Sequence, residues 1–301
     1  MDTSVTEDPG RTADRSSRVL RLTSGRRIGY AEYGAPGGRP VIALHGTPGS
    51  RYMFALIDEG ARARGLRIIA PERPGYGLSD AHRFETLAET ANDIEALADA
   101  LGLQQFVLIG VSGGGPHAVA AAALLSERVL RVALIGPVGP IDGEHIGMSH
   151  LHKFIFSHLA PSRHAASAFF LGLRTMIDWA PGTAYHLLLQ RVTETDREVL
   201  LRPEVRANLQ ATLREGLRSS VEGPLQDLRL YCAPWTLPLG EIEMPTIMWQ
   251  GSKDTVVPPE AAYRLADMLP NCRLEVIEDA GHYWIFGAFD RVLDAIRGAW
   301  R

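Results

Sequence analysis

The chain has 301 residues, of which 46% are apolar, enough for one large α/β domain with an insertion or for two small domains. A net charge of −4 argues against nucleic acid as a partner, and no run approaches the roughly 18 apolar residues of a membrane span. Residues 1–18 are polar and lack the apolar core of a signal peptide, so we expect a disordered leader and a cytoplasmic protein. The two cysteines, Cys232 and Cys272, are then expected to be reduced thiols.

Short apolar runs alternate with helical patterns along much of the chain. Strands are predicted at 19–22, 27–33, 41–44, 66–70, 106–109, 132–135, 246–249 and 274–277. Helices are predicted at 87–101, 113–126, 259–268 and 288–300. This alternation indicates an α/β fold with a mostly parallel sheet covered by helices on both faces.

The segment from 140 to 238 breaks the alternation, because it has helical stretches but no clear strand pattern. Its helices are predicted at 150–159, 165–179, 193–201 and 203–217. Strand signals resume at Thr246, so we interpret 140–238 as a helical cap inserted into a core formed by 19–139 and 239–301. Such a cap could cover the carboxyl edge of the sheet, where open α/β sheets bind ligands.

The sequence Gly110-Val111-Ser112-Gly113-Gly114 joins an apolar run to an alanine-rich helical run. This is the strand–turn–helix context of a nucleophile elbow, in which a strained turn raises the serine hydroxyl above the sheet edge. Glycines on both sides of the serine allow the strand and the helix to approach closely. Ser112 is therefore the predicted nucleophile.

Asp254 and His282 complete the order Ser…Asp…His, and each follows a predicted strand. A serine hydroxyl is a poor nucleophile at neutral pH, so an imidazole must take its proton. A carboxylate must fix the tautomer of that imidazole and stabilise its cation. Asp142, which follows the strand at 132–135, is the alternative acid.

The loop His45-Gly46-Thr47-Pro48-Gly49 follows the strand at 41–44. We expect the backbone N–H groups of Thr47 and Gly113 to form an oxyanion hole, to which Pro48 has no N–H to contribute. His45 is interpreted as a structural residue whose ring bonds the loop backbone.

Three apolar residues are placed near the expected substrate: Met53 and Phe54, which follow the oxyanion loop, and Trp284, which follows His282. His117, in the helix after Ser112, is interpreted as a packed core residue. The histidines of the 140–238 segment have no cysteine or clustered carboxylate beside them, so no metal site is predicted.

With these motifs the chain resembles the α/β-hydrolase superfamily, in particular the capped serine hydrolases similar to prolyl iminopeptidases and small-molecule esterases. Two further motifs that carry the resemblance are Arg73-Pro74-Gly75-Tyr76-Gly77-Leu78-Ser79 and Gly251-Ser252-Lys253-Asp254-Thr255-Val256-Val257-Pro258. Glu72 stands where the family usually has Asp, and we interpret it as a structural ion-pair or capping position. The prolyl iminopeptidase patterns His-Gly-Gly-Pro-Gly and Gly-Gly-Ser-Trp-Gly are only half present, which argues against peptidase activity.

The sequence thus predicts a cofactor-free serine hydrolase of α/β-hydrolase fold that cleaves a small or medium, largely apolar carboxylic ester or lactone through an acyl-enzyme. Ser112 argues against the dehalogenase and epoxide-hydrolase branches, whose nucleophile is a carboxylate. Amide, thioester, carbon–carbon and perhydrolase chemistry use the same triad and stay open, as does a non-hydrolytic receptor. The expected partner is a small molecule, and a homodimer is one alternative for the assembly.

Overall fold

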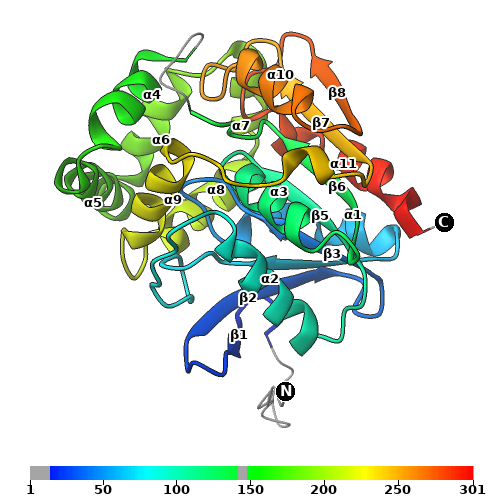
Figure 1. The fold of residues 1–301 in the computed structure, drawn as a ribbon. Coiled ribbons are helices and arrows are strands. Elements are labelled where there is room, and N and C mark those ends of the chain that lie inside the picture. Colours follow the sequence, from blue (N-terminus) through cyan, green and yellow to red (C-terminus); the bar gives the residue numbers. More distant parts are fainter. Residues whose placement is uncertain (1–13, 142–147, 301) are drawn as a thin grey trace.

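The computed structural model describes residues 14–141 and 148–300. Its centre is an eight-stranded sheet with the strand order β1-β2-β4-β3-β5-β6-β7-β8 (Figure 1). The strands are β1 (Arg18–Arg21), β2 (Arg27–Gly34), β3 (Arg39–Leu44), β4 (Leu66–Pro71), β5 (Phe106–Val111), β6 (Val129–Ile135), β7 (Thr246–Gly251) and β8 (Cys272–Ile277). The pairs β1–β2 and β2–β4 are antiparallel, and all pairs from β4 to β8 are parallel.

Both faces of the sheet are covered by helices. On β3, Val41 and Ala43 belong to a core shared with α1 (Asp58–Ala63) and α11 (Phe289–Ile296). Ile42 and Leu44 point to the other face, where α2 (Glu89–Ala100), α3 (Gly114–Leu124) and α10 (Pro259–Asp267) pack. Since neither face meets water, the central strand β5 has no polar side chain, and every one of its residues is buried.

Between β6 and β7 the described chain forms a set of α-helices, called the cap helices below. They are α4 (His150–Phe154), α5 (Arg163–Trp179), α6 (Pro181–Leu189), α7 (Glu194–Leu200), α8 (Pro203–Gly216) and α9 (Glu222–Cys232). Figure 1 shows α4, α5, α6 and α9 gathered to one side of the sheet. They fall within 140–238, whose role as a cap stays a prediction. Among residues 14–141 and 148–300, no helix has the length and hydropathy to cross a bilayer.

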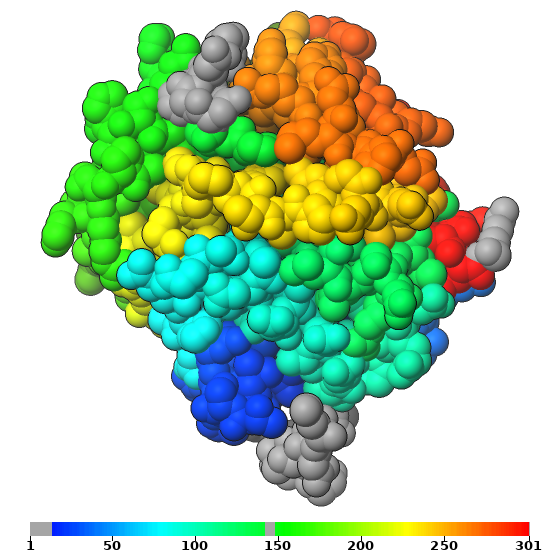
Figure 2. All heavy atoms as spheres, viewed as in Figure 1, coloured from blue at the N-terminus to red at the C-terminus, as the bar shows by residue number. Residues whose placement is uncertain are grey.

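The last of these helices, α9, packs against the core segment that follows β4. In the space-filling view, the yellow part of the chain, which contains α9, lies against the cyan part, which contains residues 75–90 (Figure 2). A Cβ added to Gly223 would lie 2.4 Å from the Tyr76 ring, and Phe84 N–H donates to Gln226 Oε1 at 2.7 Å. The close approach at Gly223 therefore requires glycine.

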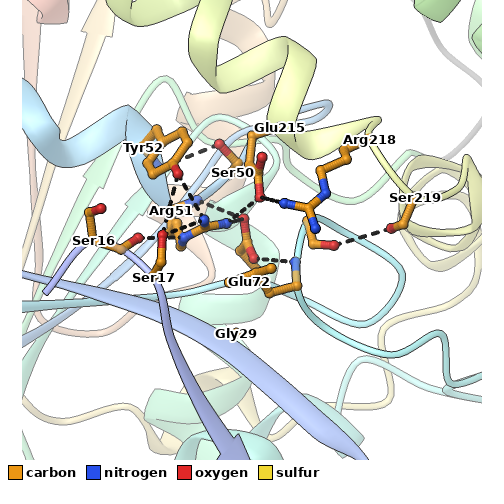
Figure 3. A network of polar contacts seen from close by, with 12 residues as sticks. Ser16, Ser17, Gly29, Ser50, Arg51, Tyr52, Glu72, Glu215, Arg218 and Ser219 are labelled. Atoms are coloured by element: carbon orange, nitrogen blue, oxygen red, sulfur yellow. Dashed lines mark hydrogen bonds and ion pairs between the residues drawn. The ribbon is translucent and has the colours of Figure 1, made fainter. Parts of the chain in front are cut away.

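Arg51 is the centre of a buried ionic network that joins the core to α8 (Figure 3). Its Nη1 lies 2.7 Å from Glu72 Oε1 and 2.7 Å from Glu215 Oε1, and the Arg51 side chain is 1% exposed. Glu72 also accepts from the Leu78 N–H at 2.7 Å. The structure thus confirms the interpretation of Glu72 as an ion-pair residue, and it identifies Arg51 as the partner.

The same arginine binds the N-terminal segment, which corrects the expectation of a disordered leader through residue 18. Arg51 Nε donates to Ser16 O at 2.6 Å, Arg51 Nη2 donates to Ser17 Oγ at 3.1 Å, and β1 begins at Arg18. A buried guanidinium needs acceptors for its N–H groups, and these polar residues supply them. Residues 1–13 lie outside the described residues.

Candidate active site

Ser112 occupies a tight turn between β5 and α3. Its φ is +52°, in the left-handed region that side chains other than glycine rarely adopt. A Cβ on Gly110 would lie 2.9 Å from Gly115 Cα, and a Cβ on Gly114 would lie 2.2 Å from Leu44 O. Glycine at these two positions therefore allows α3 to begin directly against the sheet, with Ser112 at its apex.

The side chains of Ser112, Asp254 and His282 come together at the carboxyl edge of the sheet, although the three residues are far apart in sequence. His282 Nε2 lies 3.0 Å from Ser112 Oγ, and His282 Nδ1 lies 2.7 Å from Asp254 Oδ2. The other oxygen of Asp254 accepts from the N–H groups of Val256 and Val257 at 2.8 and 2.9 Å. Because a carboxylate only accepts, the proton of neutral His282 is on Nδ1 and its Nε2 lone pair faces the serine hydroxyl.

Two carboxylates influence the basicity of His282. Burial alone would lower the pKa of His282, but the charge and hydrogen bond of Asp254 outweigh it, and Asp196 acts in the same direction, so that this pKa is raised. Asp196 belongs to α7 and is 1% exposed; a Cβ on Gly281 would lie 2.1 Å from its Oδ2. Gly281 thus allows a cap carboxylate to approach the loop that carries His282.

Two backbone donors lie beside the serine. The N–H groups of Thr47 and Gly113 have no hydrogen-bond partner among residues 14–141 and 148–300. Thr47 lies so near Gly113 that a Cβ on Gly113 would be 2.3 Å from Thr47 Oγ1. A Cβ on Gly46 would lie 3.4 Å from Ser112 Cβ. Two unoccupied N–H groups at this place can bind an anionic oxygen.

A cavity of about 300 Å³ opens at these groups, between the sheet edge and the cap helices. Its lining includes Ser112, His282, Thr47 and Gly113. Most of the wall is apolar, with contributions from Phe156, Phe170, Leu173, Leu209, Leu213 and Phe286. Within the part of the chain that the structure describes, no Arg, Lys, Asp or Glu lines this cavity. The arrangement suits an uncharged, largely apolar ligand.

The sequence profile of the Alpha/beta hydrolase family matches residues 41–295. The chain belongs to the alpha/beta hydrolase family. The 2-hydroxymuconate semialdehyde hydrolase of Pseudomonas putida is 26% identical to it over 276 residues, which are 87% of this chain and 86% of the relative.

Solved structures of other proteins share the fold. An alpha/beta hydrolase fold protein from Nakamurella multipartita matches with a TM-score of 0.70 and 22% identity, covering 94% of this chain and 98% of that one. A thermophilic esterase from Thermogutta terrifontis matches with a TM-score of 0.65 and 24% identity, covering 93% and 96%. The family profile confirms the predicted superfamily, and these structures confirm the predicted fold class.

Of the three apolar residues predicted near the substrate, one lines the cavity and two lie in the core. Met53 lines the cavity. Phe54 is fully buried in the core, where its ring packs edge-on against Phe289 at 6.3 Å, and it does not line the cavity. Trp284 is also a core residue, whereas its neighbours Tyr283 and Ile285 line the cavity. Trp284 begins a tight 3₁₀ turn, in which successive side chains point to different sides, so nearness to His282 in sequence did not show which would face the substrate.

A buried polar network that was not predicted from the sequence lies behind the Thr47 loop. Asp227 of α9 accepts from Thr47 Oγ1 at 2.5 Å, Arg73 Nη2 at 2.6 Å and Tyr76 Oη at 2.7 Å. Tyr231, one helical turn further on, donates to Gly113 O at 2.7 Å. Asp227 and Tyr231 share the buried face of α9, so a charged residue within an apolar helical stripe was the available signal.

His45 and His117, the two histidines interpreted as structural, are both buried. His45 Nδ1 lies 2.8 Å from Gly46 O, the backbone contact expected of a structural residue. His117 is buried as expected, but it is hydrogen-bonded to Asp227 at 3.1 Å and to Thr90 at 2.7 Å. Asp142 lies outside the described residues. In residues 14–141 and 148–300, no group of three His, Cys, Asp or Glu side chains is arranged to hold a metal ion.

Proposed function

We propose that this alpha/beta hydrolase family member is a serine hydrolase that cleaves small or medium, uncharged, largely apolar carboxylic esters or lactones through an acyl-enzyme. The observation that carries the proposal is the unbroken contact from Asp254 through His282 to Ser112, at 2.7 and 3.0 Å. It opens onto an apolar cavity whose lining also includes Thr47 and Gly113, the residues expected to supply the oxyanion donors. Nucleophile, base and oxyanion donors are thus all within reach of one carbonyl group.

In the first half of the reaction, His282 Nε2 takes the proton of Ser112 as Oγ attacks the carbonyl carbon. The carbonyl oxygen becomes an anion, and the N–H groups of Thr47 and Gly113 bind it. His282 then gives its proton to the leaving alkoxide as the bond from carbon to the leaving oxygen breaks. The product of this half is an ester of Ser112, and the alcohol departs.

In the second half, water takes the place of the alcohol. His282 Nε2 takes a proton from water as its oxygen attacks the acyl carbon, and the same two N–H groups bind the second oxyanion. Collapse returns the proton from His282 to Ser112 Oγ and releases the acid. Asp254 stays ionised throughout and stabilises the imidazolium in both halves.

The charge of the cavity wall supports an uncharged substrate. Muconate in the name of the Pseudomonas putida relative denotes a carboxylate, and a carboxylate buried without a cation costs several kcal/mol. The described wall has a second imidazole, that of His152 of α4. Burial, together with the nearby His282, lowers the pKa of His152 to about 4. His152 is therefore neutral near pH 7, and we favour a neutral ester over a substrate of the relative's type.

The test is steady-state hydrolysis of p-nitrophenyl esters from acetate to decanoate. We expect an optimum at about four to eight acyl carbons for a cavity at the lower end of the usual size range. Ser112→Ala should lower the rate by roughly a thousandfold or more, the scale of triad loss. Ser24→Ala, in the exposed β1–β2 turn, is the matched control and should behave as wild type.

Two outcomes would contradict the proposal. One is hydrolysis by the wild type that does not exceed that of Ser112→Ala. The other is a wild type that is labelled once by a fluorophosphonate but shows no multiple turnover on any ester of the series. The second outcome would favour a ligand receptor with an activated serine.

A further inference from the structure

We propose that Tyr231 and Asp227 of α9 are positioning residues that fix the two oxyanion donors, so that a cap helix completes the oxyanion hole of the core. The inference rests on the proposed function, because it takes the N–H groups of Thr47 and Gly113 as the donors. It concerns residues that lie behind these donors and act through them.

Tyr231 connects the two donor residues directly. Its hydroxyl donates to Gly113 O at 2.7 Å and lies 2.7 Å from Thr47 Oγ1. Tyr231 is 1% exposed, so water does not compete freely for the bond to Gly113 O. The Tyr231 proton is used in that bond and the Thr47 hydroxyl proton is donated to Asp227, so Tyr231 restrains Gly113 by a hydrogen bond and Thr47 by the close contact of the two oxygens.

Asp227 holds the same loop from behind. Thr47 Oγ1 donates to its Oδ2 at 2.5 Å, and Arg73 Nη2 lies 2.6 Å from the same oxygen. Arg73 also donates to the carbonyl oxygens of His45 and Gly46, at 2.5 and 3.2 Å. Burial alone would raise the pKa of Asp227, but Arg73 and His117 outweigh it and hold that pKa well below its usual range. The carboxylate is thus a fixed negative charge that holds Thr47 and Arg73 together.

The loop needs such support because it has few side chains of its own. Gly46 and Gly49 flank Thr47 and Pro48, and Gly113 is itself without a side chain. Glycine permits the close approach of backbone to substrate, but it leaves the backbone free to take other conformations. Oxyanion donors contribute to catalysis only when they are held in place before the charge develops. The bonds from α9 supply that restraint.

A second connection between cap and core offers a comparison. Glu215 of α8 also pairs with a buried core arginine, Arg51, at 2.7 Å. No contact joins Glu215 to Thr47 or Gly113 among the residues described. Asp227 and Glu215 are therefore two buried cap carboxylates that each pair with a buried core arginine, and of the two Asp227 touches an oxyanion donor.

The first experiment compares Tyr231→Phe with Tyr33→Phe, a buried core tyrosine whose hydroxyl also donates to a backbone carbonyl, that of Arg51. Active sites are counted with a fluorophosphonate, and kcat and KM are expressed per active site. We expect Tyr231→Phe to lower kcat by about 10- to 100-fold, somewhat less than loss of a whole donor, with KM within about twofold. Tyr33→Phe should keep the wild-type kcat.

The second readout is the affinity of an aryl trifluoromethyl ketone. Ser112 Oγ adds to its carbonyl carbon, the serine proton moves to His282, and the resulting hemiketal oxyanion occupies the hole. We expect Tyr231→Phe to weaken this affinity by the same factor as kcat, because both depend on the oxyanion. Asp227→Asn should act in the same direction, whereas Glu215→Gln should lower only the denaturation midpoint.

The inference is overturned if Tyr231→Phe keeps the wild-type kcat and ketone affinity. It is also overturned if the variant only has fewer sites that react with the fluorophosphonate and a lower thermal stability. The ketone forms its adduct without turnover. Its affinity therefore decides the inference even when the wild type hydrolyses no ester, which is the result that would refute the proposed function instead.

Discussion

At the scale of single residues, the site depends on which nitrogen of each histidine carries the proton. Asp254 only accepts, so neutral His282 presents its Nε2 lone pair to Ser112. Asp227 also only accepts, so neutral His117 has its proton on Nε2 and accepts from Thr90 at Nδ1. Burial lowers the pKa of His117, whereas Asp254 overcomes burial at His282 and raises its pKa. One imidazole is thus suited to a structural role and the other to taking a proton.

The amide variant Asp254→Asn tests the tautomer of His282. An amide can donate to Nδ1 and stabilise the wrong tautomer, so we expect kcat to fall by about 10⁴-fold with the fold intact. The measurement is ester hydrolysis per active site, with Asp267→Asn on the exposed end of α10 as the control. A rate near wild type would move the acid to Asp142.

The raised pKa of His282 predicts the pH dependence. Protonated His282 cannot take the serine proton, so kcat/KM should fall as the pH drops through a value above the ordinary 6.5. In Asp254→Asn the charge that raises this pKa is gone, so the acidic limb of the residual activity should move to lower pH. The measurement is kcat/KM from about pH 5 to 9, and a flat wild-type profile across that range would contradict the assignment of His282 as the base.

At the scale of secondary-structure elements, the site depends on how closely α3 and the loop after β3 can approach. Gly114→Ala would place a Cβ 2.2 Å from Leu44 O, and we expect a loss of about 1–3 kcal/mol in the free energy of unfolding together with lower activity. Gly172→Ala on the exposed face of α5 has nothing within 4 Å and should stabilise by about 0.5–1 kcal/mol. Urea denaturation measures both, and equal effects would refute the steric argument.

The contact between the core and α8 can be tested through its arginine. Arg51→Ala leaves the buried Glu72 carboxylate without its cation, and we expect a loss of about 3–5 kcal/mol in the free energy of unfolding. Arg62→Ala breaks an exposed pair with Asp58 and should change stability by less than about 0.5 kcal/mol. A small effect at Arg51 in urea denaturation would show that water replaces the ion pair.

The core strands and the Ser112 turn could be predicted because their signals are local. Buried parallel strands require continuous apolar runs, and the turn between β5 and α3 requires glycine at 110 and 114. Both signals are readable within a few residues of sequence, although the contact that requires glycine at 114 is with the distant Leu44 O. The strand predictions therefore lie within the observed strands or extend one residue past them. Most helix ends differ by at most two residues, but α4 ends at Phe154 where the prediction ran to 159, and α11 ends at Ile296 where it ran to 300.

The helix α9 and the roles of its polar residues could not be predicted, because their partners are distant in sequence. Asp227 meets Arg73 across 154 residues, and Tyr231 meets Gly113 across 118. The position of Asp227 among the apolar residues of its helical stripe could at most mark it as buried, and could not identify its partners. The predictions that Phe54 and Trp284 lie near the substrate were wrong for a related reason, because the packing of the 3₁₀ turns decides which side chains face the cavity.

At the scale of the whole molecule, the uncharged wall of the cavity should select against charged acyl chains. We expect the p-nitrophenyl monoester of adipic acid, with a free terminal carboxylate, to react with a kcat/KM about 100-fold or more below that of its terminal methyl ester. The two substrates have the same chain and leaving group, so the comparison isolates the charge. Equal values for the two would mean that the chain end reaches water.

The bonds from α9 to Thr47 and Gly113 bear on how such an enzyme can be recombined. An exchange of the whole 140–238 segment with that of another family member would transfer new cavity walls but remove Asp227 and Tyr231 from their core partners. A chimaera designed to change substrate range should therefore keep α9 with Thr47, Arg73 and Tyr76 as one inherited unit. The exchange is then best restricted to the stretch from α4 to α6, which supplies Phe156, Phe170 and Leu173 to the wall.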